Sequence, residues 1–139
     1  MLIIWAYIVL VQTILWRTPD TTLKPVLRPF QSYIDALKED GQKELLRSNF
    51  MNVVLFYPAG LLAESILPVE WKHVTRLLVV LTVFTIFSTA IEYIQYCYNL
   101  GLAQTDDVIH NALGALIGAV VTPIITVVFK NKQCKNPQR

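Results

Sequence analysis

The charged side chains of this 139-residue chain are gathered into blocks, and this arrangement restricts its fold more than any single motif does. Lys, Arg, Asp and Glu crowd into residues 17–47, 70–76 and 130–139, and the stretches between are almost free of charge. Charged residues make up 16% of the chain, against roughly a quarter in soluble domains. A soluble core would intersperse its charges, so the pattern indicates a protein that crosses a membrane several times.

Four apolar runs lie between or beside the charged blocks, and each is predicted to form a transmembrane helix. About 20 helical residues cross the hydrocarbon core of a bilayer, so the third run is the clearest and the first two are short. The first run lacks the basic start and small-residue cleavage site of a signal peptide. We therefore predict an all-α polytopic membrane protein, a single domain over residues 1–139, whose bundle has transmembrane helices at about 2–16, 50–67, 77–98 and 108–129.

An amphipathic helix is predicted at about residues 30–39, between the first and second spans. Phe30, Tyr33, Ile34 and Leu37 follow the spacing i, i+3, i+4 and i+7, which places them on one helical face. In a soluble protein that face would pack on a core. Between two spans, it is expected to lie along the membrane surface.

The basic tail, residues 130–139, favours one orientation in the plasma membrane. Lys and Arg are shared equally between the two predicted sides, so the positive-inside rule alone gives a tie. The tail contains no acid and directly follows the last span. We therefore predict a multi-pass protein with both termini in the cytoplasm.

Polar residues gather where the third and fourth spans are joined by a short turn. Glu92 and Gln95 lie near the end of one span, and Asp106, Asp107 and Asn111 open the next. Ionisable groups at membrane depth cost at least a few kcal/mol each and usually face a partner or a cavity. We therefore predict a shared polar pocket near the outer membrane surface.

Helical spacing adds two glycines to this locus. Asp107, Asn111, Gly114 and Gly118 share one helical face, and the glycines form a small-xxx-small pair that admits another helix. If this face meets the face of Glu92 and Gln95, Gly114 would permit the close approach of the third and fourth spans. The binding residues predicted from the turn and the spacing are Glu92, Gln95, Asp106, Asp107 and Asn111, with Gly114 and Gly118 as packing positions.

Structural roles explain the same residues equally simply. Asp106 and Asp107 are suited to cap the N-terminus of the fourth helix, where negative charge is favoured. Glu92 would then pair with a loop arginine such as Arg28 or Arg47. The amides Gln95 and Asn111 would hold helices together.

Three further titratable residues are expected to be structural or solvated. His110 directly precedes Asn111 and lies roughly 100° around the helix from the shared face, which favours a structural role. Glu64 is expected to reach the membrane interface beside Lys72 or Arg76. His73 is expected to be a solvated loop residue.

Several classes of function lack support in the sequence. No basic stripe with interleaved aromatic residues indicates nucleic-acid binding. Cys97 and Cys134 are expected to be free thiols. The predicted pocket has no nucleophile–base pair, and no Lys or Arg to hold a phosphate. We therefore assign no catalytic residue, metal site or cofactor, and we expect membrane lipids and lipid-linked envelope precursors as partners.

Three motifs, in this order and between hydrophobic spans, resemble the VanZ-like family of small membrane proteins, named for one associated with teicoplanin resistance. The resemblance covers roughly residues 28–125 and includes Arg28-Pro29-Phe30. Leu102 and Gln104 stand where family members often carry Arg and Asp, which leaves fewer charges in this region. The motifs are Asn52-Val-Val-Leu-Phe-Tyr-Pro-Ala-Gly, Ser88-x-x-x-Glu92-x-x-Gln95 and Asp106-Asp107-x-x-x-Asn111-x-x-Gly114-x-x-x-Gly118. The resemblance implies that Asn52 of the second span is a further binding residue beside those at the turn.

Two functions of different classes follow. The first is a non-enzymatic envelope protein that contributes to glycopeptide resistance and binds a lipid-linked or anionic head group in its pocket. The alternative is a small intramembrane enzyme acting on a lipid-linked precursor, with Glu92, Asp106 and Asp107 holding a divalent cation. Binding of Mn²⁺ or Mg²⁺ that is lost on Asp107→Asn would favour the enzyme.

Overall fold

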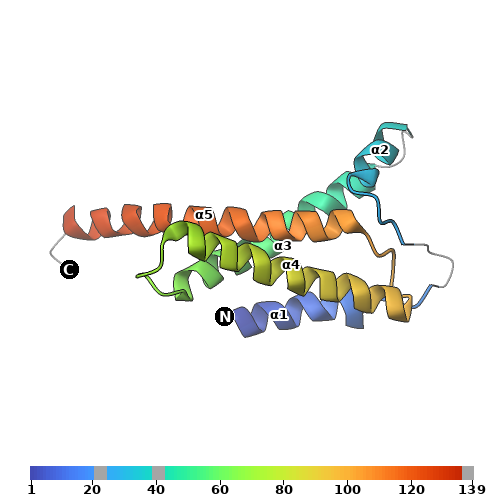
Figure 1. Ribbon diagram of the computed structural model, residues 1–139, viewed down its shortest axis with the longest axis horizontal. Helices are drawn as coiled ribbons and strands as arrows, with labels where there is room; N and C mark the ends of the chain where they lie inside the picture. Colours follow the sequence, from blue (N-terminus) through green and yellow to red (C-terminus); the bar gives the residue numbers. More distant parts are fainter. Residues whose placement is uncertain (21–24, 39–42, 136–139) are drawn as a thin grey trace.

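The computed structural model describes residues 1–20, 25–38 and 43–135, which form helices joined by turns and contain no strand. Helices α1, α3, α4 and α5 lie side by side in an elongated bundle, and α2 stands off at one end (Figure 1). The predicted all-α class is confirmed. In chain order the elements are α1 (Leu2–Leu10), the π-helical turn η1 (Val11–Leu15), α2 (Gln31–Lys38), α3 (Lys43–Ile66), α4 (His73–Tyr98) and α5 (Thr105–Lys135).

Two helices of the described chain are long and apolar enough to span a membrane: α4, and α5 from Thr105 to Phe129. They agree with the third and fourth predicted spans. The first predicted span is a shorter apolar helix, Leu2–Leu15, formed by α1 and η1. The second lies within α3, which has 24 residues but begins with a charged turn. Membrane crossing by these two segments therefore stays a prediction.

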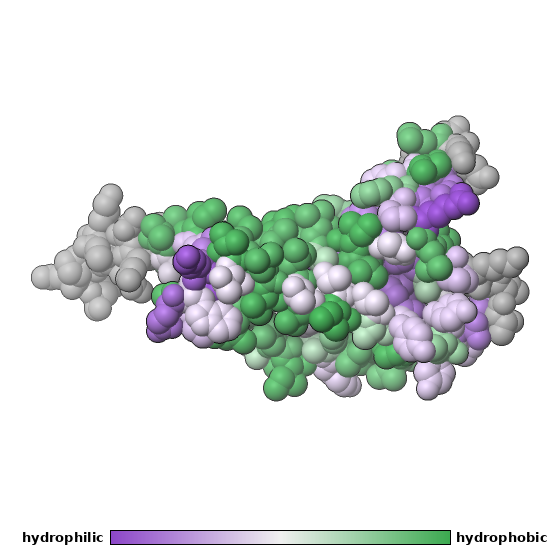
Figure 2. Space-filling model, in the orientation of Figure 1, coloured by the Kyte–Doolittle hydropathy of each residue, from purple (hydrophilic) through white to green (hydrophobic). Residues whose placement is uncertain are grey.

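The outer faces of the bundle are apolar. In an apolar stretch of 18 residues within each helix, only 22% of the residues of α4 and 28% of those of α5 are buried. Figure 2 shows hydrophobic side chains over the middle of the bundle and hydrophilic ones toward its two ends. A soluble protein rarely exposes so large a continuous apolar surface. This arrangement therefore supports a membrane protein whose helices face lipid.

Glycines allow α3 and α5 to pack with their backbones in contact. A Cβ at Gly60 would collide with the Ala115 backbone, and one at Gly114 with the Val53 backbone. Gly118 meets the carbonyl of Tyr57 in the same way. From Val53–Gly114 through Tyr57–Gly118 to Leu61–Thr122 the paired positions rise together in sequence, so α3 and α5 run parallel. The helix that Gly114 and Gly118 admit is thus α3, and not α4 as the sequence suggested.

An aromatic cluster joins α1 to this pair and to α4. Trp5 packs edge-on against Phe56 of α3 and Phe84 of α4, with ring centroids 5.0 and 5.5 Å away. Its indole N–H donates to the Leu55 carbonyl at 2.8 Å. Buried Trp normally needs such a partner for its N–H. The cluster therefore fixes α1 in the bundle, with α1 running parallel to α4.

A buried ion pair closes the end of the bundle where α3 turns into α4. Arg76 Nη2 lies 3.0 Å from Glu64 Oε1 and 2.7 Å from the Glu64 carbonyl oxygen. Arg76 is one of the two partners expected for Glu64, but the carboxylate is fully buried instead of extending to the interface. His73 opens α4 with Nδ1 3.3 Å from the same oxygen, so it is only partly the solvated residue expected.

Candidate functional site

The opposite end of the bundle holds the turn between α4 and α5. Asn99 ends α4 in the left-handed conformation, with φ 53°, and Gly101 follows with φ 136°. The extended segment before α2 runs beside this turn: Val26 N–H donates to the Ala103 carbonyl at 2.9 Å, and Thr105 N–H donates to the Val26 carbonyl at 3.1 Å. These bonds hold residues 25–27 against the start of α5, and so complete one wall of a cavity.

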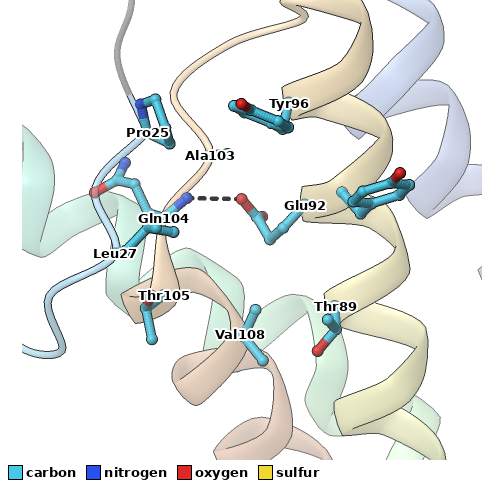
Figure 3. A pocket seen from close by; sticks show the side chains of 10 residues that line it. Pro25, Leu27, Thr89, Glu92, Tyr96, Ala103, Gln104, Thr105 and Val108 are labelled. Atoms are coloured by element: carbon cyan, nitrogen blue, oxygen red, sulfur yellow. Dashed lines mark hydrogen bonds between the residues drawn. The ribbon is translucent and has the colours of Figure 1, made fainter.

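Glu92 presents its carboxylate to that cavity, which has a volume of about 520 Å³. The Gln104 N–H donates to Glu92 Oε2 at 2.8 Å, and Figure 3 shows the two groups facing each other across the site. The remaining wall is mainly apolar or aromatic and comes from α4, α5 and the segment before α2. The lining residues are Pro25, Leu27, Thr89, Glu92, Tyr93, Tyr96, Ala103, Gln104, Thr105 and Val108.

A second polar group lies inside the bundle, behind the cavity. Asn111 Nδ2 donates to Ser88 Oγ at 2.8 Å and so links α5 to α4. Asp107 is buried, and Asn52 of α3 lies beside it. Three buried atoms of this group have no hydrogen-bond partner within the described chain: Asp107 Oδ1, Asn111 Oδ1 and Asn52 Nδ2. Asp107 also acts electrostatically on Glu92, and the two groups are together called the polar region below.

Asp106 is turned away from this region and caps α2. Its Oδ1 accepts from Phe30 N–H at 2.5 Å, and its Oδ2 accepts from Ser32 N–H at 2.9 Å and from the Ser32 hydroxyl. Asn49 of α3 donates to that hydroxyl oxygen at 2.8 Å. A carboxylate at a helix N-terminus satisfies backbone donors that have no helical partner. The capping role weighed for Asp106 is therefore found, but on α2 instead of its own helix.

His110 fastens α2 at a second point. Its Nδ1 lies 2.5 Å from the Asp106 carbonyl oxygen, and its Nε2 lies 2.7 Å from the Tyr33 hydroxyl. A carbonyl oxygen only accepts, so Nδ1 carries a proton, and in the neutral ring Nε2 accepts from the tyrosine. This is the structural role expected for His110.

Gln95 lies apart from the cavity and contacts the first helix. Its Nε2 donates to the Thr13 carbonyl at 3.0 Å, and its buried Oε1 has no partner in the described chain. Such amide-to-backbone bonds hold transmembrane helices together. Of the predicted binding residues, Glu92 thus lines the cavity, Asp107, Asn111 and Asn52 lie behind it, and Asp106 and Gln95 hold neighbouring elements.

The sequence model of the VanZ/LLP1 family matches residues 1–126. The chain belongs to the VanZ/LLP1 family. The resemblance drawn from the three motifs is therefore confirmed and extends through the first helix. No curated protein and no solved structure matches the chain at a significant level.

Arg17 is the residue of this VanZ/LLP1 protein that the sequence argument missed. A Cβ on Gly101 would collide with the Arg17 guanidinium, so the side chain lies directly against the α4–α5 turn. Arg17 acts electrostatically on both Glu92 and Asp107. The structural alternative paired Glu92 with Arg28 or Arg47 and did not consider Arg17. The available signal was position, since Arg17 directly follows the first apolar run and that run ends beside this turn.

The three carboxylates weighed as ligands of a divalent cation do not converge on one point. A shared cation would need Glu92, Asp106 and Asp107 together. Both carboxylate oxygens of Asp106 already accept hydrogen bonds from the start of α2. Among the residues whose placement is described, no three His, Cys, Asp or Glu side chains are grouped closely enough to hold a metal ion.

Proposed function

We propose that this VanZ/LLP1 protein is a multi-pass protein of the plasma membrane whose cavity receives the head group of a membrane lipid or of a lipid-linked envelope precursor. We further propose that this binding contributes to teicoplanin-type glycopeptide resistance. One observation supports the proposal most directly: Glu92 places a backbone-held carboxylate in the wall of an otherwise mainly apolar cavity. Most ligand sites combine an apolar lining with a few fixed polar groups in this way.

The position of the cavity favours a ligand that comes from the bilayer. Thr89, Tyr93 and Tyr96 line it and are exposed on the outer side of α4. Tyrosines gather at the level of lipid head groups, where one side of the ring is apolar and the hydroxyl reaches water. A lipid that lies against α4 would therefore reach Glu92 without passing through the bundle.

Because α1, α3, α4 and α5 alternate in direction (Figure 1), the bundle begins and ends on the same side, and the acid-free basic tail favours the cytoplasm for that side. The polar region would then lie at the outer surface, and α2 would rest on the membrane there with its exposed apolar side chains Phe30, Ile34 and Leu37. A reporter that is active only in the cytoplasm, fused after Arg139, should be active. A stable but inactive fusion would reject this orientation.

The functional test compares Glu92→Gln and Asp107→Asn with Glu70→Gln, a control at the exposed loop of the opposite end. In a host in which the protein raises the inhibitory concentration of teicoplanin, both site variants should lower it at an unchanged membrane level. The control should not. The double variant should be little worse than either single one, because groups that act as a unit are non-additive. Full resistance in both single variants would reject a functional role for this region.

A further inference from the structure

The charges around the cavity restrict the chemistry of its ligand. Among the described residues that line it there is no Lys or Arg, and Glu92 is the one charged side chain of that described lining. Asp107, buried behind the wall, and Arg17, exposed at the α4–α5 turn, act on Glu92 with opposite sign. An anionic head group that carries no cation of its own would meet a carboxylate, with no Lys or Arg in the described lining. The sequence-based expectation of an anionic head group is therefore not favoured.

The hydrogen bonding of Glu92 leaves one acceptor open to a ligand. Oε2 accepts from the Gln104 N–H, while Oε1 accepts no hydrogen bond from the described part of the chain. A carboxylate oxygen in a mainly apolar wall is stabilised by a cationic donor, because charge-assisted hydrogen bonds are about twice as strong as neutral ones. Tyr93 and Tyr96 line the same cavity, and aromatic rings also attract ammonium groups.

We propose that the cavity binds an aminophospholipid, whose protonated primary amine donates to Glu92 Oε1. This inference rests on the proposed function and names the ligand class of the same site. The volume of about 520 Å³ suits a phospholipid head group, whereas the sugar-peptide head of an envelope precursor is far larger. The exposed side of α4 leaves room for the acyl chains to remain in the bilayer. A quaternary ammonium has no N–H, so it would lack the hydrogen bond to Glu92.

The experiment measures binding of short-chain phosphatidylethanolamine, phosphatidylcholine and phosphatidylglycerol to the purified full chain in detergent by native mass spectrometry. Phosphatidylethanolamine should bind most tightly. Glu92→Gln should weaken its binding by about tenfold or more and remove the preference, since about 1.4 kcal/mol of a charge-assisted bond corresponds to tenfold. Glu70→Gln should leave the preference unchanged.

A second variant separates the cavity from the charge. Val108→Trp places a large side chain in the cavity from α5 and keeps Glu92. It should therefore weaken binding of all three lipids. Equal or tighter binding of phosphatidylglycerol that is lost in Val108→Trp would overturn the amine assignment and leave the proposed lipid site standing. A preference for phosphatidylethanolamine that survives Glu92→Gln would also overturn the assignment. Lipid binding that is absent, or indifferent to Val108→Trp, would overturn both proposals.

Discussion

Replacing Arg76 by methionine should lower the free energy of unfolding by about 3–5 kcal/mol, the cost found when one partner of a buried ion pair is removed. The Glu64 side chain has 0% exposure, and its Oε1 lies 3.0 Å from Arg76 Nη2. Its other oxygen, Oε2, is buried and accepts no hydrogen bond within the described chain. Without the guanidinium, the carboxylate must remain charged and unpaired or take up a proton.

The opposite substitution should be milder. Glu64→Gln keeps the shape of the side chain, and Arg76 still donates to the carbonyl oxygen of residue 64 at 2.7 Å. The Arg76 side chain is 15% exposed, so its head group can also reach water. We expect a loss of about 1–2 kcal/mol. In the double variant the unpaired charge is absent, so its stability should be close to that of Glu64→Gln alone, giving a coupling of about 3–5 kcal/mol, the full cost of Arg76→Met.

These free energies can be measured by reversible unfolding in mixed micelles with increasing sodium dodecyl sulfate, followed by far-UV circular dichroism. His73 lies 3.3 Å from Glu64 Oε1 and can replace part of the lost positive charge. The four proteins are therefore also compared in a His73→Asn background, where the effect of Arg76→Met should be larger. An Arg76→Met protein within about 1 kcal/mol of the parent in both backgrounds would refute the reasoning, as would additive effects in the double variant.

Three other changes test how the site is held. Asp106→Ala removes three hydrogen bonds to the start of α2, so amide hydrogen exchange at Ser32 should accelerate while exchange in the middle of α4 stays slow. Unchanged protection of the Ser32 amide would contradict the capping role of Asp106. Gly118→Ala brings a methyl group against the α3 backbone and should lower the free energy of unfolding by about 1–3 kcal/mol. Ile117→Ala on the outer face should lower it less, and similar losses in both variants would contradict the close packing. Gly101→Ala is strained at φ 136° and displaces Arg17, so it should reduce teicoplanin resistance as Glu92→Gln does; full resistance would argue against a role for Arg17.

The sequence alone determined the helical class, the two clearest spans and the family. Long apolar runs without charge have few structural solutions in a membrane, because every backbone polar group must be satisfied within the helix. The same reasoning placed Glu92 and the residues opening α5 at one end of the bundle, since a short turn forces two spans to be antiparallel neighbours. It also identified Gly114 and Gly118 as places where a helix approaches closely, but not which helix.

Only the tertiary structure decided which partner each polar residue meets. Asp106 and Asp107 are adjacent in sequence, yet about 100° separates neighbouring residues on a helix, so one faces α2 and the other faces the interior. Arg17 and the segment at Val26 reach the α4–α5 turn from more than 70 residues away. Helical periodicity describes one helix at a time and carries no information on the rotation of a helix about its axis relative to its neighbours. The cavity at Glu92 depends on these long-range neighbours, and for that physical reason the fold alone defines it.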